Sequence, residues 1–202
     1  MKPITVVFFG RSGSGKGTQA ALLIEKLKEL DGGSGVVYVE TGERFRQFAK
    51  ESPSLTAQMT RDVMARGGLM PASLPIWAWS SVLIDGVKTG KEHLVFDGVA
   101  RRVDEAPILD QALQFYGKEK PVIILLDVPP PEVTERLIKR GRADDKHEKI
   151  AERLKWFETD VMPSVNYFKQ SPTCRFVVVN GHQTIEKVFE DVLKVLGIPD
   201  RV

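Results

Sequence analysis

A glycine-rich loop directly after a short apolar run constrains the fold of this chain more than any other feature. The run Ile4–Phe9 (ITVVFF) is followed by Gly10–Lys16 (GRSGSGK), and an amphipathic pattern begins at Lys16. A β-branched and aromatic run of this length is typical of a buried strand, whereas the later pattern repeats its apolar residues at helical spacing. The sequence therefore predicts a strand, a tight loop and a helix in immediate succession.

This loop has the chemistry of a phosphate-binding site. Glycines at its two ends let the backbone approach phosphate oxygens, and the N-terminus of the following helix adds its dipole. Lys16 supplies a charge for the β- and γ-phosphates, but Gly17 stands where the strict pattern has Ser or Thr, so the hydroxyl near Mg²⁺ is assigned to Thr18. A glycine-rich turn that binds nothing is the alternative, and the order of strand, loop, lysine and helix favours a nucleoside triphosphate. The residues predicted to bind it here are Gly13, Ser14, Gly15, Lys16, Gly17 and Thr18.

Strands and helices alternate along the rest of the chain. Buried parallel strands are predicted at Ile4–Phe9, Val36–Glu40, Leu94–Phe96, Val122–Val128 and Phe176–Val179. Amphipathic helices are predicted at Lys16–Leu30, Pro130–Lys139, Ile150–Phe168 and Ile185–Leu196. This alternation predicts a doubly wound α/β fold with a parallel five-stranded sheet, whose ligands bind at the carboxyl ends of the strands.

Two stretches interrupt the alternation. Thr41–Leu74 is helical in pattern and contains no strand, and Gly141–Asp145 is too brief to form an element. We expect both to be insertions over the site of a single domain, whose core comprises residues 1–40, 75–140 and 146–202.

Charge and cysteine content narrow the class of protein. The 29 basic and 27 acidic residues leave a formal charge of +2, which argues against a broad surface for nucleic acid or anionic lipid. The single cysteine, Cys174, excludes an internal disulfide and fits a reducing compartment. Ile4–Phe9 is too short for a signal-peptide core or a membrane span. We therefore expect a cytoplasmic protein that binds neither nucleic acid nor membrane.

Four short motifs occur along the chain, and their order and spacing are hard to obtain by chance. They are GKGTQA at Gly15–Ala20, TGERFR at Thr41–Arg46, DGVARR at Asp97–Arg102 and GRADD at Gly141–Asp145, with Arg153 downstream. Together they resemble the adenylate kinase family of nucleoside monophosphate kinases over nearly the whole chain. The resemblance implies a P-loop NTPase fold with a monophosphate-binding insertion at residues 41–74 and a very short lid at residues 141–145, which leaves no room for a zinc site. It also implies reversible transfer of a phosphoryl group from Mg·ATP to AMP, giving two ADP, and we expect the protein to be a monomer.

The same resemblance assigns roles to charged residues outside the phosphate loop. Phosphoryl transfer spreads negative charge over the moving group, so positioned cations carry much of the catalysis. The resemblance implies that Asp97 holds a water on Mg²⁺ and that the catalytic residues are Lys16, Arg101, Arg140, Arg142 and Arg153. It further implies that Arg136, Gln183 and Ile185 border the ATP adenine, Gln183 through its backbone carbonyl. The implied acceptor site consists of Thr41, Arg46, Met70, Gly98, Arg101 and Glu105.

Simpler interpretations of these residues stay open. Arg136 and Arg140 lie four residues apart on one predicted helix, where a solvated charged face is common, and Asp97 can be a turn residue at a strand end. Asp144 and Asp145 have two compatible interpretations, because carboxylates favour a helix N-terminus and the resemblance implies that the pair orients the lid arginines. The joint placement of the arginines favours the functional interpretation.

Glu105 stands where the family normally has a glutamine against the acceptor adenine. An amide both donates and accepts, which matches adenine, whereas an ionised carboxylate only accepts and suits the two donors of guanine. A buried mismatch costs about 1–3 kcal/mol, which is about 5- to 150-fold in affinity. One hypothesis is therefore altered acceptor specificity, toward GMP or another monophosphate, and the other is an acid in the first turn of a helix that starts near Asp104.

A different class of function is an ATP-binding module without catalysis. Such a module has no need of charge aimed at a transition state. Lys16, Asp97 and the three lid-side arginines therefore argue against it.

Overall fold

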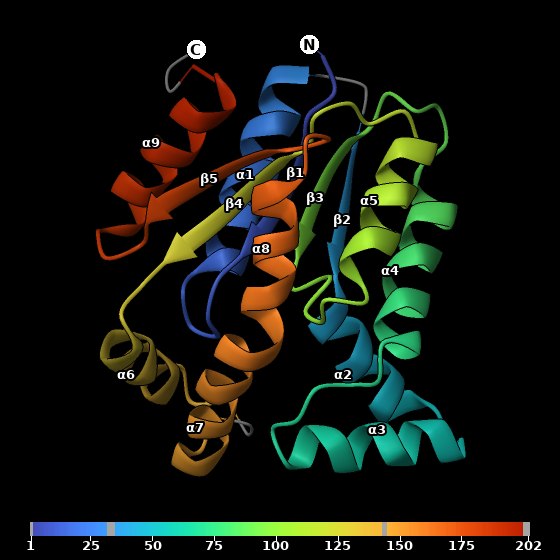
Figure 1. The fold of residues 1–202 in the computed structure, drawn as a ribbon, viewed down its shortest axis with the longest axis vertical. Helices are drawn as coiled ribbons and strands as arrows, with labels where there is room; N and C mark the ends of the chain where they lie inside the picture. Colours follow the sequence, from blue (N-terminus) through green and yellow to red (C-terminus); the bar gives the residue numbers. More distant parts are fainter. Residues whose placement is uncertain (1, 32–34, 143–144, 200–202) are drawn as a thin grey trace.

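A five-stranded, wholly parallel sheet forms the centre of the molecule, as predicted (Figure 1). The computed structural model describes residues 2–31, 35–142 and 145–199. The strand order is β2-β3-β1-β4-β5, and Val6 of β1 pairs with Val95 on one side and Val122 on the other. The strands are β1 (Thr5–Phe9), β2 (Val36–Glu40), β3 (His93–Asp97), β4 (Val122–Asp127) and β5 (Arg175–Asn180).

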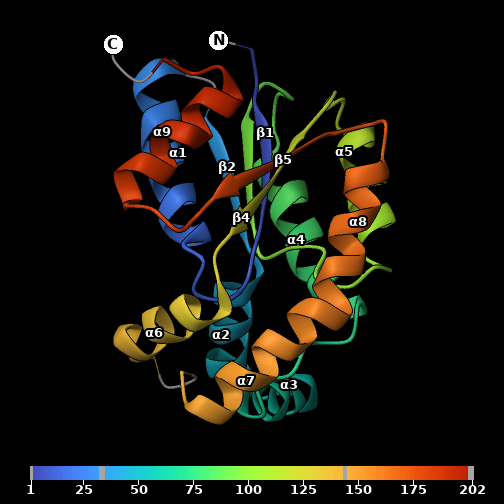
Figure 2. The ribbon, with the colours of Figure 1, turned by 60° about the vertical axis from the view of Figure 1, so that its left-hand side comes forward.

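Helices cover both faces of this sheet, and Figure 2 shows α1 and α9 on one side with α4, α5 and α8 on the other. Side chains alternate along a strand, so Val6 and Phe8 of β1 pack under α1 and α9 whereas Val7 and Phe9 face the opposite layer. The helices are α1 (Lys16–Asp31), α2 (Thr41–Glu51), α3 (Leu55–Ala65), α4 (Ser73–Gly86), α5 (Ala106–Phe115), α6 (Pro130–Arg140), α7 (His147–Trp156), α8 (Met162–Gln170) and α9 (Ile185–Leu196), with a π-helical turn, η1 (Phe157–Val161), between α7 and α8.

Most predicted elements lie within a residue of their observed ends, but the helix predicted at Ile150–Phe168 is wrong as a single α-helix. Pro163 lacks an N–H and cannot donate the bond that a continuous α-helix requires. Just before it, the N–H of Met162 donates to the oxygen of Phe157, five residues back, which is the bond of a π-turn. The segment therefore divides into α7, η1 and α8.

The carboxyl ends of the strands all point toward one end of the molecule, where α2, α3, α6 and α7 gather (Figure 1). Residues 41–74, predicted as an insertion, form α2, α3 and the start of α4. Helix α6 begins with two prolines, whose fixed φ suits the first helical positions. It ends at Gly141, whose φ of +67° terminates the helix in the left-handed conformation.

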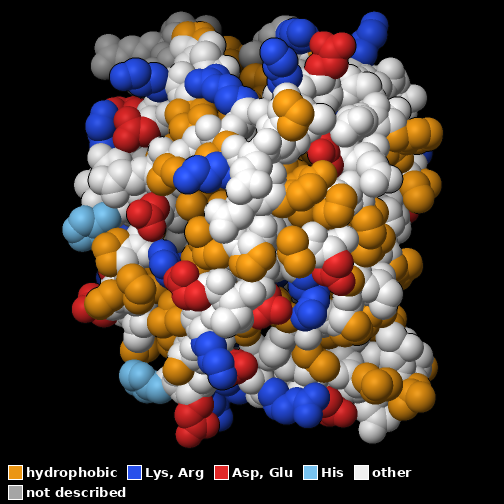
Figure 3. All heavy atoms as spheres, viewed as in Figure 1, with side chains coloured by type: hydrophobic (Ala, Val, Ile, Leu, Met, Phe, Trp, Pro, Cys, Tyr) orange, Lys and Arg blue, Asp and Glu red, His pale blue; other side chains and the backbone are white. Residues whose placement is uncertain are grey.

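The exterior is mixed in chemical character. On the face drawn in Figure 3, basic and acidic side chains are interspersed with hydrophobic ones. None of the helices in the described part of the chain combines the length and the apolar character needed to cross a bilayer.

Candidate active site

A cavity of about 930 Å³ lies at the carboxyl ends of the strands. Its walls come from the loop after β1, from α2, from the turn after β3, from α6 and α7, and from the loop before α9. Every residue assigned to a site from the sequence lines it, namely Gly13, Ser14, Gly15, Lys16, Gly17, Thr18, Thr41, Arg46, Met70, Asp97, Gly98, Arg101, Glu105, Arg136, Arg140, Arg142, Arg153, Gln183 and Ile185. The fold therefore brings residues from most of the chain's length to one place.

The phosphate loop requires glycine for reasons of space as well as conformation. Gly13 has a φ of +84°, and a Cβ there would lie 2.9 Å from the carbonyl oxygen of Val133 in α6. The loop runs directly into α1 at Lys16, so the unpaired N–H groups of the first turn lie beside it. This combination of close backbone and helix N-terminus is suited to an anion.

Lys16 is held within the loop. Its Nζ donates to the carbonyl oxygens of Gly10 at 2.9 Å and Arg11 at 3.0 Å. Burial lowers the pKa of Lys16 to about 8, against the opposing effect of the Asp97 carboxylate. The ammonium therefore remains largely protonated at pH 7 and is fixed in direction before any ligand binds.

Asp97 explains why glycine follows the lysine. It ends β3, is 8% exposed, and its Oδ2 would lie only 3.3 Å from a Cβ placed on Gly17. A serine or threonine at position 17 would crowd this carboxylate, whereas Thr18 is exposed on the first turn of α1. No group of three or more His, Cys, Asp or Glu side chains that could hold a metal ion occurs among the residues described. A carboxylate and a hydroxyl that line the same cavity fit Mg²⁺, which binds through few protein ligands together with water and substrate phosphates.

Asp145 joins the arginines of the lid side. Its carboxylate accepts hydrogen bonds from Arg140 Nε at 2.9 Å, Arg140 Nη2 at 2.8 Å, the Arg142 backbone N–H at 3.2 Å and Arg153 Nη1 at 3.1 Å. Burial alone would raise the pKa of Asp145, but the bonds and charge of Arg140, the backbone of Arg142 and the charge of Arg153 lower it. The carboxylate therefore stays ionised and holds two guanidinium groups in fixed positions.

The capping interpretation of this acidic pair is wrong for Asp145. The residue at the N-cap of α7 is Lys146, and no side chain makes a capping bond there. The carboxylate of Asp145 is instead occupied by the arginines, which are charged and stronger donors than a neutral N–H. Asp144 lies outside the described residues.

The turn after β3 organises the part of the cavity that was predicted to bind the acceptor. The carbonyl oxygen of Gly98 accepts from the hydroxyl of Thr41 and, at 3.0 Å, from Arg101 Nε. Gly98 has a φ of +69°, which other residues rarely adopt, and a Cβ there would lie 2.5 Å from Arg101 Nη2 and displace the guanidinium from its present position. Arg46 donates from Nη2 to Glu40 at 3.1 Å and from Nε to Glu43 at 2.8 Å. Two arginines from different elements thus line the same side of the cavity.

Glu105 is a buried carboxyl group in the cavity wall. Helix α5 begins at Ala106, later than predicted, and Glu105 occupies its N-cap position without making a capping bond. The residue is 1% exposed, and its Oε2 has no hydrogen-bond partner among the residues described. Burial raises the pKa of Glu105 to about 7, against the opposing charge of Arg101. This carboxyl group therefore changes its protonation state near neutrality.

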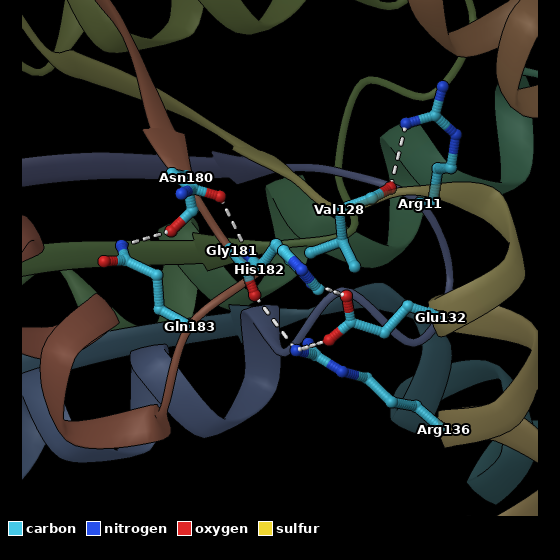
Figure 4. A network of polar contacts seen from close by, with 8 residues as sticks. All are labelled: Arg11, Val128, Glu132, Arg136, Asn180, Gly181, His182 and Gln183. Atoms are coloured by element: carbon cyan, nitrogen blue, oxygen red, sulfur yellow. Dashed lines mark hydrogen bonds and ion pairs between the residues drawn. The ribbon is translucent and has the colours of Figure 1, made fainter.

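Figure 4 shows polar contacts between α6 and the loop after β5, and Arg136, Gly181 and Gln183 from these two segments also line the cavity. Arg136 Nη2 donates to the carbonyl oxygen of Gly181 at 3.0 Å and also to Glu132, which in turn contacts His182. Gln183 Nε2 donates to the oxygen of Asn180 at 2.8 Å. The side chain of Arg136 is therefore held against the loop, which a purely solvated helix face would not require.

Some lining residues were not anticipated. Glu40 ends β2, so the general rule about carboxyl ends of strands was a usable signal for it. Trp156 also lines the cavity, but an aromatic residue in an amphipathic helix pattern predicts core packing and gives no sign of a site.

Comparison with known proteins gives a consistent result. The model of the family described as adenylate kinase matches residues 8–173. The chain is 34% identical over 195 residues to an adenylate kinase of Bacteroides fragilis, covering 95% of this chain and 97% of that protein. It is 32% identical to an adenylate kinase of Phocaeicola vulgatus, covering 94% and 96%, and 31% identical to adenylate kinase 1 of a Synechocystis species, covering 95% and 96%.

Proposed function

Since this chain belongs to the adenylate kinase family, we propose that it reversibly transfers the γ-phosphoryl group of Mg·ATP to AMP, giving two molecules of ADP. The observation that carries the proposal is the meeting of cations from separate elements, Lys16, Arg101 and Arg153, around one cavity. Each has a defined protein contact, so the charge needed to stabilise a transferring phosphoryl group is positioned before reaction.

On the donor side, the phosphate loop and Lys16 bind the triphosphate of ATP. Gly181 and Arg136 border its adenine, together with Gln183 and Ile185. Thr18 and Asp97 would hold Mg²⁺, which neutralises phosphate charge when bound.

On the acceptor side, Arg46 and Arg101 bind the phosphate of AMP, since guanidinium groups can pair with phosphate oxygens in a bidentate way. Arg140, Arg142 and Arg153 stabilise the charge that develops during transfer. Asp145 keeps two of these arginines in place. Their preorganisation lowers the barrier because little reorientation is needed in the transition state.

Glu105 contacts the acceptor base. In its protonated form the carboxyl group donates from one oxygen and accepts at the other, as an amide does, and this matches N1 and N6 of adenine. A carboxyl group whose pKa is about 7 is in this form for much of the protein at neutral pH. Glu105 is therefore compatible with AMP as the acceptor.

Residues 41–74 and 141–145 act as two covers that close over the acceptor and the donor. Closure excludes water, which limits hydrolysis of ATP. We expect the enzyme to act as a cytoplasmic monomer, because its free Cys174 suits a reducing compartment and one chain supplies every proposed site residue.

The test is product formation by the purified chain with Mg·ATP and, separately, AMP, GMP, CMP and UMP. We expect ADP from AMP with a kcat/KM at least about tenfold above that of any other acceptor, as one buried mismatch implies. Efficient phosphorylation of GMP would overturn AMP specificity and leave phosphoryl transfer standing. Tight ATP binding without product from any acceptor would overturn the kinase assignment.

A further inference from the structure

Trp156 occupies a position in the site that none of the proposed catalytic roles uses. It is the last residue of α7, three residues after Arg153, and is 8% exposed. Its side chain lines the cavity and makes contacts with two other parts of the site wall.

The first contact joins α7 to the acceptor insertion. The indole Nε1–H of Trp156 donates to the carbonyl oxygen of Gly67 at 2.9 Å, in a buried hydrogen bond. Gly67 follows α3 with a φ of +72°, and a Cβ there would lie 3.3 Å from the Cβ and the carbonyl oxygen of Lys149 in α7. The loop after α3 therefore lies directly against α7, along the face that carries both Lys149 and Trp156.

The second contact supports an acceptor-side arginine. The guanidinium carbon of Arg101 lies 5.7 Å from the centre of the Trp156 ring, within the range of a cation–π interaction. Arg101 is otherwise fixed by the bond from its Nε to Gly98. The ring thus limits where the other end of the guanidinium can move.

We propose that Trp156 is a positioning residue for the acceptor: its N–H holds the insertion loop against α7 and its ring supports Arg101. Because Arg153 lies on the same helix, the acceptor phosphate then meets Arg101 and Arg153 in one fixed arrangement. This inference rests on the proposed function. It adds that a hydrogen bond joins the insertion, residues 41–74, directly to the helix that carries the proposed catalytic residue Arg153.

A purely structural tryptophan is available for comparison in the same chain. Trp79 in α4 is 1% exposed, does not line the cavity, and its Nε1 has no hydrogen-bond partner within the described residues. Replacing Trp79 by phenylalanine therefore leaves a core defect without removing a bond in the site. Replacing Trp156 removes the bond to Gly67 and keeps an aromatic ring under Arg101.

The experiment measures KM for AMP, KM for ATP and kcat for the wild type, Trp156→Phe and Trp79→Phe. We expect Trp156→Phe to raise KM for AMP about three- to tenfold, the effect of one hydrogen bond, with KM for ATP within about twofold of the wild type. Trp79→Phe should lower the melting temperature and leave both KM values within about twofold. An unchanged KM for AMP in Trp156→Phe, an equal rise in both KM values, or the same rise in Trp79→Phe would overturn the proposal.

Failure of the proposed function is visible in the wild type alone. If another monophosphate proves to be the acceptor, the same comparison is made with that nucleotide. If the wild type forms no product from any acceptor, nucleotide affinity measured by calorimetry replaces KM, with the same expected ratios.

A spectroscopic measurement tests the placement without altering Trp156. The chain has three tryptophans, so Trp77→Phe/Trp79→Phe leaves Trp156 as the only indole fluorophore. We expect addition of AMP to change its emission in a saturable way, because the ring lies on the wall that the acceptor contacts. Emission that does not respond to saturating AMP would contradict the proposed position at the acceptor.

Discussion

The proposed donor and acceptor sides of the cavity are built in different ways. On the donor side, cations are held by fixed oxygen atoms of the protein: Lys16 by carbonyls of the phosphate loop, Arg136 by Gly181, and Arg140 by Asp145. On the proposed acceptor side, the wall includes Glu105, a buried carboxyl group with a pKa near 7 and one oxygen that has no hydrogen-bond partner among the described residues. Backbone carbonyls and carboxylates hold cations on both sides, because Gly98 binds Arg101 and Glu40 binds Arg46 on the proposed acceptor side. The difference is that the proposed acceptor side also contains a carboxyl group that titrates near neutrality.

From this difference we infer that acceptor selectivity depends on Glu105. A backbone carbonyl presents the same acceptor at every pH, but a carboxyl group changes from donor and acceptor to acceptor alone when it ionises. We therefore expect changes on the donor side to alter the rate of reaction, and changes in Glu105 to alter which acceptor is used and at which pH.

The largest effect is expected for Lys16→Ala on the donor side. Removing a preorganised charge at the transferring phosphates should lower kcat by about 10²- to 10³-fold, measured as ADP formation under saturating substrates. Lys28→Ala is the matched control, because Lys28 is an exposed lysine of the same helix that pairs only with Glu25 among the described residues. A loss of less than tenfold in Lys16→Ala would contradict the central role of this lysine.

The second effect concerns the carboxylate that holds the lid arginines. Asp145→Asn should lower kcat about 10- to 100-fold, because Arg140 and Arg153 lose the charge that orients them. Glu148→Gln, an exposed acid in the first turn of α7, is the control and should stay within about twofold.

The same variant has a predicted pH signature in stability. The pKa of Asp145 is lowered in the folded protein, so its stabilising contribution is present above the unfolded value of 3.8 and disappears as the pH falls through the folded value. Denaturant unfolding should therefore show Asp145→Asn to be less stable than the wild type by about 2 kcal/mol at pH 7. If wild type and Asp145→Asn differed in free energy of unfolding by the same amount at pH 7 and at a pH below the folded pKa, ionisation of Asp145 would not be the cause of the difference.

The third effect would reveal the titrating group on the acceptor side. As pH rises from 6.0 to 7.5, Glu105 loses its proton, and KM for AMP should rise about three- to fivefold for a pKa near 7. This range stays below the value of about 8 for Lys16, so the donor side keeps its charge.

Glu105→Gln is the control for that titration. The amide keeps a donor and an acceptor at every pH, so the variant should lose the part of the pH dependence that belongs to the enzyme and show a lower KM for AMP at pH 7.5. Any dependence that remains in Glu105→Gln belongs to the phosphate of AMP itself. A wild type and variant with identical pH profiles would show that Glu105 does not contact the acceptor base.

The smallest effect is expected for Gln183→Ala at the donor adenine. The side chain of Gln183 bonds Asn180 and Asp191 within the protein, and its contribution to ATP is proposed to come from the backbone. KM for ATP should therefore change by less than about threefold, as expected for loss of a partly exposed hydrogen bond. A tenfold increase would mean that both sides of the cavity recognise their bases through side chains.

Local signals in the sequence predicted much of the fold. The run before Gly10 and the lysine after the loop define a strand, a turn and a helix within a few residues, and the structure follows that order. The five strands were recognisable because buried parallel strands are short, continuous apolar runs. Helix α4 (SLPIWAWSSVLIDG) was not predicted, since its apolar residues lie on all sides and show no helical period.

The parts of the candidate site that depend on tertiary contacts were harder to predict from the sequence. The sequence could not decide between capping and arginine binding for Asp145, because the donors come from α6 and from a later turn of α7. The sequence identified Glu105 as a departure from the family's usual glutamine. The burial that raises its pKa, against the opposing charge of Arg101, is visible in the structure alone. Trp156 gave no signal, since its partner Gly67 is distant in sequence and contributes only a backbone oxygen.

The position of β1 at the centre of the sheet has a consequence for synthesis of the chain. β1 leaves the ribosome before both of its neighbours in the sheet, which are β3 at residues 93–97 and β4 at residues 122–127. Such long-range pairings form late, because closing a long loop costs conformational entropy before the stabilising contacts between the strands can form. The phosphate loop at the end of β1 therefore cannot gain its complete support until β4 has been translated, and a nascent chain that stops before β4 carries the motif without the site.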